Sequence, residues 1–420
     1  MPTALDQPTP TRRRLTRRQV YRRRRVVVFG GLALVLATLV YLPLTLLAPL
    51  RAAAVTVTAP QETVPPAVPL VFPEYGAAGI AAVGMPGLLG QSGSTEALPM
   101  ASITKLITAL VVLEAHPLAP GEEGPTVTMS AADARYYGEY LALNGSVSPV
   151  RAGMVLTQRD LLELTLVKSA NNYTKSLVTW AFGSPDAYVA AARAWLDAHG
   201  LDRIVVTEPT GIDRANVGPV DQLIALGQLA LEQPTVADLV ATSVVDVPGL
   251  GTLPNTNQLL GVDGVDGIKT GTLDDFGANL LFSADYTVGS STVTLVGVVL
   301  GGPSHPRIDA DIRTLLASTI ANFSEVEVAA EGEPFAVYAT LWGVEASAVA
   351  SERATLLVYG EEPIETRVVT EDVTTGEAGD DVGDIVVTSG VRSVTIDLEL
   401  AIDVDDPGPW WRLTNPALLF

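Results

Sequence analysis

An uncharged apolar segment near the N-terminus constrains the fold of this chain more than any other feature. Residues 26–50 contain no charged side chain. A helix rises about 1.5 Å per residue, so this segment would reach roughly 35 Å, enough to cross the hydrocarbon core of a bilayer. We therefore expect one transmembrane anchor at residues 26–50.

The flanks of this segment predict its orientation. Residues 1–25 carry nine arginines and one aspartate, and such a basic flank stays in the cytoplasm. We expect a single-pass membrane protein whose N-terminus is cytoplasmic and whose residues from Arg51 onward are extracytoplasmic. A cleaved signal peptide is one alternative, because "RAAAV" follows the run, although the run exceeds the usual signal-peptide length. A basic arm that binds nucleic acid is the other alternative.

Charge and composition exclude several classes of function. The net charge is −21, and the first 25 residues contribute +8, so the remainder carries −29 and is a poor partner for nucleic acid. The chain has no cysteine, which excludes disulfides, a cysteine nucleophile and thiolate metal sites. His116, His199 and His305 are far apart in the sequence and are interpreted as structural. We expect no metal or organic cofactor.

The composition and the hydrophobic pattern of the sequence change twice after the membrane segment. Residues 51–76 are rich in proline, threonine and valine and predict an extended extracytoplasmic linker. Residues 77–323 mix short β-type runs with clear helices, one of which begins at the capping pattern Thr157-x-x-Asp160. Residues 324–420 contain only short strand-like runs and predict a second, β-rich domain.

A lysine marks the first candidate site. Only four of the 26 basic residues are lysines, and one of them, Lys105, follows Ser102 by one helical turn. Arginine cannot lose its proton in a protein, whereas a lysine that is buried or lies beside another cation can become a neutral base. A neutral amine beside Ser102 could remove the hydroxyl proton and activate the serine as a nucleophile. Alone, Ser-x-x-Lys is a weak signal, because an N-capping serine and a surface lysine give the same pattern.

Two further motifs strengthen this interpretation. Ser169-x-Asn171 lies downstream, and Lys269-Thr270-Gly271 follows it, next to Thr272. The three motifs in this order are the signature of penicillin-binding proteins and serine β-lactamases.

The sequence resembles the D-alanyl-D-alanine carboxypeptidase family, the low-molecular-mass penicillin-binding proteins of serine peptidase family S11. Four stretches carry the resemblance: "ASITKLITALVVLE", "GMVLTQRDLLELTLVKSANN", "EPTGIDRANVGPVDQLIAL" and "NTNQLLGVDGVDGIKTGTLDDFGANLLFSA". It implies an α+β catalytic domain like that of serine β-lactamases and DD-peptidases, with an antiparallel sheet flanked by helices. The β-rich C-terminal domain is in keeping with the family.

The resemblance also implies a reaction and a role for each motif residue. The family removes the terminal D-alanine from the pentapeptide stems of peptidoglycan, and β-lactam antibiotics acylate its serine. Ser102 would be the nucleophile, Lys105 its base and Ser169 a proton relay to the leaving group. The remaining motif residues would bind substrate. Asn171 would hold the amide carbonyl, Lys269 would attract the terminal carboxylate, and Thr270 would add a hydroxyl to the same network. Gly271 would leave room for the peptide along the strand, and the N–H groups of Thr272 and Ser102 would bind the oxyanion.

Other functions stay open for the same motifs. A DD-endopeptidase would use the same site on cross-linked peptides, and a wall-binding scaffold would keep the residues without turnover. Class A β-lactamases use a glutamate near the position of Glu208 for deacylation. Here "TGID" follows Glu208-Pro209 without the expected leucine and asparagine, and Ala170 replaces the usual aspartate, so this alternative is the weaker one.

Overall fold

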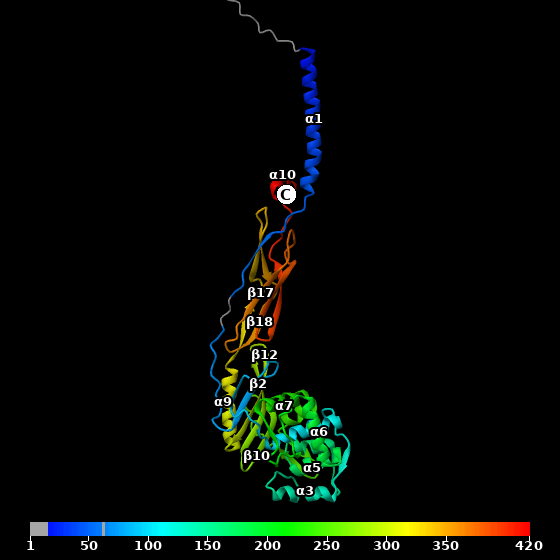
Figure 1. The fold of residues 1–420 in the computed structure, drawn as a ribbon, viewed down its shortest axis with the longest axis vertical. Helices are drawn as coiled ribbons and strands as arrows, with labels where there is room; N and C mark the ends of the chain where they lie inside the picture. The colour runs from blue at the N-terminus through cyan, green and yellow to red at the C-terminus, as the bar shows by residue number, and fades with distance from the viewer. Residues whose placement is uncertain (1–15, 61–63) are drawn as a thin grey trace, which may run out of the picture.

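The computed structural model describes residues 16–60 and 64–420 and shows an elongated molecule. Helix α1 (Arg17–Leu46) lies at one end, a β domain lies in the middle, and a larger α+β domain lies at the far end (Figure 1). The first fifteen residues of the predicted basic tail, and residues 61–63 of the predicted linker, lie outside the described residues.

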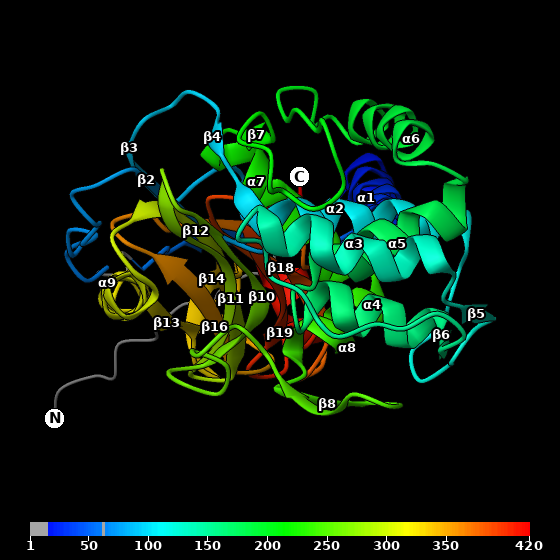
Figure 2. The same cartoon turned by 90° about the horizontal axis from the view of Figure 1, so that it is seen from below.

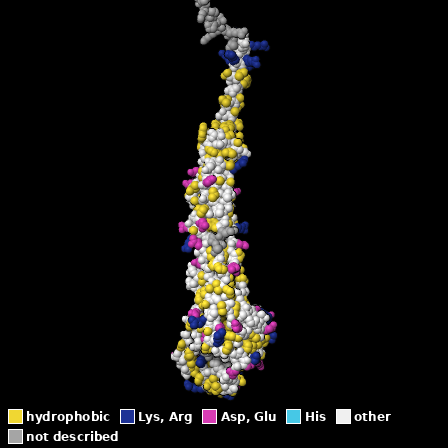
Figure 3. Space-filling view, turned by 90° about the vertical axis from the view of Figure 1, so that its left-hand side faces the viewer, with side chains coloured by type: hydrophobic (Ala, Val, Ile, Leu, Met, Phe, Trp, Pro, Cys, Tyr) yellow, Lys and Arg dark blue, Asp and Glu magenta, His cyan; other side chains and the backbone are white. Residues whose placement is uncertain are grey.

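Helix α1 contains most of the apolar segment predicted from the sequence. It begins among the arginines, nine residues before that segment, and ends at Leu46, shortly after an internal proline, Pro43. Within the described residues, α1 is the one helix that is long and apolar enough to span a membrane. Its apolar side chains are exposed along its length, with basic side chains gathered at its outer end (Figure 3). This exposure fits a helix that is surrounded by lipid.

The α+β domain is built on one antiparallel sheet. Its five strands lie in the order β10 (Val265–Leu273), β11 (Gly277–Val288), β12 (Ser291–Gly302), β2 (Ala77–Ala82) and β3 (Gly90–Gly93). Strands β11 and β12 are central and mostly buried, because helices cover both faces of the sheet. The predicted fold class, an antiparallel sheet flanked by helices, is confirmed.

Helix α9 (His305–Ile320) covers one face of this sheet and packs on β11 and β12. The other helices lie on the opposite side (Figure 2). They are α2 (Thr104–Ala115), α3 (Ala131–Ala142), α4 (Gln158–Leu166), α5 (Asn171–Phe182), α6 (Pro185–Ala198), α7 (Val220–Glu232) and α8 (Pro234–Ala241). Three short strand pairs form in the segments before, between and after these helices. They are β4 (Leu98–Pro99) with β7 (Val217–Gly218), β5 (Thr126–Thr128) with β6 (Val155–Thr157), and β8 (Val244–Val247) with β9 (Gly251–Pro254).

Helix α4 begins at the capping box that the sequence predicts. The Thr157 hydroxyl accepts a hydrogen bond from the Asp160 N–H at 3.1 Å, and the Asp160 carboxylate accepts one from the Thr157 N–H at 2.7 Å. These contacts satisfy two N–H groups that have no partner within the helix.

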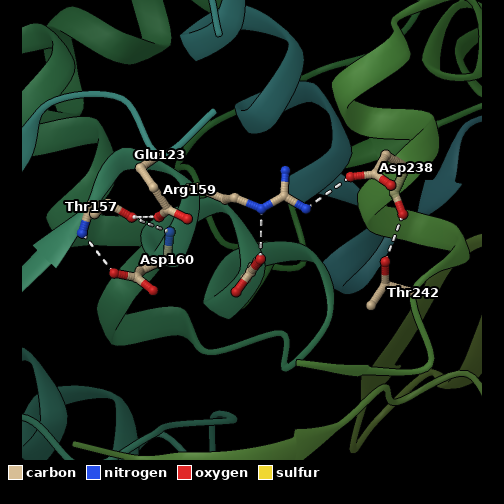
Figure 4. A network of polar contacts seen from close by, with 7 residues as sticks. Glu123, Thr157, Arg159, Asp160, Asp238 and Thr242 are labelled. Atoms are coloured by element: carbon tan, nitrogen blue, oxygen red, sulfur yellow. Dashed lines mark hydrogen bonds and ion pairs between the residues drawn. The ribbon is translucent and has the colours of Figure 1, made fainter. Parts of the chain in front are cut away.

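An ion-pair network on α4 ties this helix to its neighbours (Figure 4). The Arg159 guanidinium donates to Glu163 at 3.0 Å within α4 and to Asp238 of α8 at 2.8 Å. Thr157 donates to Glu123, which lies in the loop after α2. Helix α4 is thereby fixed on both sides, and its end leads directly into the Ser169 segment.

The β domain has a core of its own and confirms the predicted β-rich C-terminal domain. Its larger sheet has the order β1-β14-β15-β19-β18-β17, and β13 and β16 form a separate pair. The bounds are β1 (Ala54–Val57), β13 (Phe323–Ala329), β14 (Pro334–Ala339), β15 (Glu345–Ala350), β16 (Ala354–Tyr359), β17 (Glu365–Thr370), β18 (Asp381–Ser389) and β19 (Arg392–Leu400).

Two segments of this region differ from the sequence-based expectation. The linker is extended, as predicted, but it is not a free tether: β1 pairs along β14, and the Val68 N–H donates to Asn322 at 2.7 Å. The C-terminus is not all β, because α10 (Gly408–Thr414) and α11 (Pro416–Leu419) follow the last strand. The guanidinium of Arg412 donates to the Ala48 carbonyl at 2.6 Å, so the C-terminal helices lie beside the C-terminal end of α1.

Candidate active site

Ser102 lies in a tight turn between the sheet and helix α2. The turn is the 3-10 segment η1 (Ala101–Ile103), and α2 starts immediately after it. Ala101 has φ 49°, a conformation that alanine rarely adopts, and the Thr104 hydroxyl holds its carbonyl at 2.8 Å. Unusual backbone of this kind concentrates at functional sites, where the surrounding structure over-determines it.

Lys105 lies beneath Ser102, as the one-turn spacing predicts. Its side chain is fully buried, and its amine donates to the Ser102 hydroxyl and to the Thr210 carbonyl, each at 2.7 Å. A buried amine with two neutral acceptors and no carboxylate contact is poorly compensated as a cation.

The surroundings of Lys105 favour its neutral form. Burial lowers the pKa of the Lys105 amine well below its usual range, and the nearby charge of Lys269 lowers it further. The negative charge of Glu208 opposes both effects. Burial also lowers the pKa of Lys269 to about 7. The site thus holds two lysines whose pKa values lie below that of an ordinary lysine.

Ser169 and Asn171 lie at the junction between α4 and α5. Ser169 is buried and has φ 61°, a second left-handed non-glycine residue at this site. Asn171 is the first residue of α5, and its N–H donates to the Ser146 carbonyl at 2.8 Å. Among the described residues, nothing donates a hydrogen bond to the buried Asn171 Oδ1. An unpaired acceptor at a cleft is suited to an N–H donor on a ligand.

The third motif lies on β10, next to the Ser102 turn. Lys269 is buried, and within the described part of the chain its amine donates only to the Thr270 carbonyl, at 3.3 Å. The hydroxyls of Thr270 and Thr256 are 2.6 Å apart. A Cβ on Gly271 would lie 3.0 Å from the Met100 carbonyl oxygen and 3.2 Å from the Ser102 nitrogen. The absence of a side chain therefore lets β10 approach the Ser102 turn closely. This close approach is a second reason for glycine at position 271, besides the predicted room for the substrate peptide.

The three motifs meet at one open cleft with a volume of about 460 Å³. Six of the eight predicted residues line it, namely Ser102, Ser169, Asn171, Thr270, Gly271 and Thr272, whereas Lys105 and Lys269 lie buried beneath its surface. The cleft therefore presents hydroxyls and amides to a ligand, with the two amines behind them.

His305 is a cleft residue that the sequence analysis did not identify. It was interpreted as structural, but it lines the cleft, and its Nε2 lies 2.8 Å from the Thr272 hydroxyl. Burial and the charge of Lys269 lower the pKa of its imidazole. Its neighbours in the sequence carry no motif, so only the fold could reveal its position.

The other two lysines and the other two histidines have simple structural contacts. Lys175 donates to Glu139 at 2.8 Å on the surface, and Lys168 is half-buried beside Ser169. His116 contacts the Ala181 carbonyl, and His199 contacts the Trp195 carbonyl. Neither histidine lines the cleft.

A family model described as D-alanyl-D-alanine carboxypeptidase, peptidase S11, matches residues 87–304. Among curated proteins, a D-alanyl-D-alanine endopeptidase of Pseudomonas aeruginosa is 31% identical over 207 residues, 47% of this chain and 63% of that protein. The D-alanyl-D-alanine carboxypeptidase DacA of Escherichia coli is 28% identical over 240 residues, 56% of this chain and 58% of that protein. The chain thus spans about three fifths of the length of these relatives.

Solved structures share the fold at low sequence identity. Penicillin-binding protein 5 from Haemophilus influenzae superposes with a TM-score of 0.55 at 19% identity, over 82% of this chain and 100% of that one. A D-alanyl-D-alanine carboxypeptidase from Mycobacterium tuberculosis gives a TM-score of 0.51 at 22% identity, over 63% of this chain and 96% of that one.

Proposed function

Because the chain belongs to the D-alanyl-D-alanine carboxypeptidase family, peptidase S11, we propose that it is a serine DD-carboxypeptidase. It would remove the terminal D-alanine from the pentapeptide stems of peptidoglycan through an acyl-enzyme on Ser102. β-Lactam antibiotics would acylate the same serine and act as covalent inhibitors.

The acylation step uses the contact between Lys105 and Ser102. The neutral amine of Lys105 takes the Ser102 hydroxyl proton while Oγ attacks the carbonyl carbon of the penultimate D-alanine. The N–H groups of Ser102 and Thr272 stabilise the oxyanion. The C–N bond then breaks, and the amine of the leaving D-alanine receives the proton through Ser169. Water later hydrolyses the ester, which releases the shortened stem and restores Ser102.

Substrate binding follows from the groups that surround the cleft. Asn171 holds the amide of the stem peptide, and the peptide lies along β10 beside Gly271. Lys269 and Thr270 attract the terminal carboxylate, and the bound carboxylate favours the protonated form of the Lys269 amine.

One observation carries this proposal: the buried Lys105 amine lies 2.7 Å from the Ser102 hydroxyl and has a lowered pKa. An amine held as a cation could not accept the proton. A surface lysine with an ordinary pKa would be almost fully protonated at neutral pH.

A DD-endopeptidase is the second candidate, and one observation favours it. The Pseudomonas aeruginosa relative, which is 31% identical over 207 residues, is named an endopeptidase. The two activities would share the acyl-enzyme chemistry and differ in whether the leaving amine belongs to free D-alanine or to a cross-linked stem.

A β-lactamase mechanism through Glu208 has little support. The Glu208 carboxylate accepts hydrogen bonds from donors of its own turn, on both oxygens. Its lone pairs are therefore occupied, and it is poorly suited to activate a water for deacylation.

We also propose that α1 anchors the protein in the cell membrane with the catalytic domain outside. The length and apolar surface of α1 support the anchor, and the arginines of its first turns support the orientation. Within this scheme, residues 77–323 are the catalytic domain and residues 324–420 the β domain, which lies between the anchor and the cleft.

The substrate is tested with two purified peptidoglycan fragments and the full-length protein in detergent. Release of free D-alanine from a linear pentapeptide stem, without cleavage of a cross-linked dimer, supports the carboxypeptidase. Cleavage of the dimer alone would reassign the protein as an endopeptidase, and the absence of both reactions would leave a wall-binding scaffold.

A further inference from the structure

Glu208 organises a turn that none of the three motifs includes. One carboxylate oxygen accepts from the Thr210 N–H at 2.9 Å and from the Thr210 hydroxyl at 2.7 Å. The other accepts from the Gly211 N–H and, at 2.6 Å, from the Asn216 amide. A carboxylate that accepts several hydrogen bonds from one turn fixes the backbone of that turn.

This turn packs directly on the machinery around Ser102. The Thr210 carbonyl accepts from the Lys105 amine at 2.7 Å, and the neighbouring Pro209 carbonyl accepts from the Thr108 hydroxyl at 2.8 Å. Lys105 and Thr108 are three positions apart on α2 and lie on the same face of the helix, so the turn of residues 208–216 packs along that face.

Two further contacts hold the turn against the residues that precede Ser102. Gly211 has φ 80°, and a Cβ there would lie 1.8 Å from the Ala101 carbonyl oxygen. The Asn216 carbonyl accepts from the Met100 N–H at 3.0 Å. Gly211 and Asn216, which both donate to Glu208, thus contact the two residues that precede Ser102.

We propose that Glu208 is a positioning residue, which holds the Thr210 carbonyl against the Lys105 amine and thereby aims that amine at Ser102. Glu208 does not touch the reacting atoms, and it acts through the turn of residues 208–216. The inference rests on the proposed function, in which Lys105 is the base that activates Ser102.

The charges around Lys105 determine what a change at Glu208 would do. Among the described residues, Lys269 of β10 and Glu208 are the two charged groups that act on the Lys105 amine. Tyr140 of α3 and Tyr188 of α6 also lie near Glu208, but burial raises the pKa of both phenols, so they stay neutral. Loss of the Glu208 charge would leave Lys269 unopposed and favour the neutral form of Lys105.

The test is the rate of Ser102 acylation by benzylpenicillin as a function of pH, measured by intact mass on the full-length protein in detergent. Four proteins are compared: the wild type, Glu208→Gln, Glu208→Asp and Glu139→Gln. Glu139→Gln is the matched control, because it replaces the same carboxylate by the same amide at a surface ion pair with Lys175.

We expect Glu208→Gln to lower the plateau rate about tenfold, because the Thr210 carbonyl is no longer held in place. The acidic limb of its pH–rate profile should move to lower pH, because the Glu208 charge that favours the ammonium form of Lys105 is gone. Glu208→Asp keeps the charge on a shorter side chain, so its limb should stay at the wild-type pH while its plateau falls. Glu139→Gln should follow the wild-type profile.

A folded Glu208→Gln variant whose plateau rate equals that of the wild type, or whose acidic limb stays at the wild-type pH, would overturn the inference. If that variant does not fold, Glu208→Asp decides: a reduced plateau supports the inference, and a wild-type profile contradicts it. Failure of the proposed function has a different outcome, because the wild type itself would then not be acylated.

Discussion

The amine of Lys105 donates to the hydroxyl of Ser102 at 2.7 Å from one turn further along the chain, in a site where the Ser102 turn packs on β10. This contact places an amine of lowered pKa on the hydroxyl of the serine that we propose as the nucleophile. It also explains why a chain with only four lysines has one at position 105.

Replacement of Lys105 by arginine tests the need for a base that can be neutral. Arginine keeps the positive charge but stays protonated, so it cannot take the Ser102 proton. We expect acylation by benzylpenicillin to slow by about 100-fold or more. Intact mass over time measures the rate, and thermal unfolding checks that the variant is folded. Near-wild-type acylation in Lys105→Arg would show that another group is the base.

Replacement of Lys269 by methionine should make the protein more stable and less active. Lys269 is buried with one weak hydrogen bond, so its cation costs folding free energy that methionine avoids. We expect the midpoint of thermal unfolding to rise by at least about 2 °C at neutral pH. Lys175→Met is the control and should give no gain, since Lys175 has an ion pair at the surface.

The gain in stability from Lys269→Met should depend on pH, and it should fall as pH rises. The pKa of Lys269 is about 7 in the folded protein and 10.5 as an ordinary lysine, so the unfolded chain binds more protons between these values. The wild type therefore gains stability as pH rises from about 7 towards 10.5. The difference in unfolding midpoint between Lys269→Met and the wild type should narrow over that interval. A constant difference would contradict the assignment of a buried, titrating amine.

A side chain at Gly271 should disturb the site without unfolding the domain. A Cβ there would lie 3.0 Å from the Met100 carbonyl oxygen, so β10 must shift away from the Ser102 turn by a few tenths of an ångström. We expect Gly271→Ala to slow acylation about tenfold. Gly138→Ala is the matched control, because a Cβ at Gly138 meets no atom within 4 Å. Equal rates in the two variants would show that this close approach does not position Ser102.

The sequence predicted the parts of the site that are marked by side-chain chemistry. Ser102, Lys105, Ser169 and Lys269 belong to spaced motifs, and the one-turn spacing of the first two predicted their contact. The capping box at Thr157 was predicted for the same reason, since both partners are side chains close in sequence.

Other parts of the site and fold could not be predicted, for physical reasons. The second partner of Lys105 is a backbone carbonyl, that of Thr210, which any residue could supply. His305 reaches Thr272 only because β11 and β12 return the chain to the edge of the cleft. The pairing of β1 with β14 joins residues more than 270 positions apart, and a proline-rich linker gives no sign of it.

The central claim is that Ser102 is a nucleophile activated by Lys105, and the intact mass of the full-length protein after mixing with benzylpenicillin tests it most directly. The wild type should gain the mass of one penicillin and keep it over the time course, because Glu208, with both carboxylate oxygens hydrogen-bonded, is poorly suited to activate a water that would hydrolyse the penicillin ester. Ser102→Ala should show no adduct. Rapid loss of penicillin without an adduct would indicate a β-lactamase, and no reaction of the wild type would contradict the account.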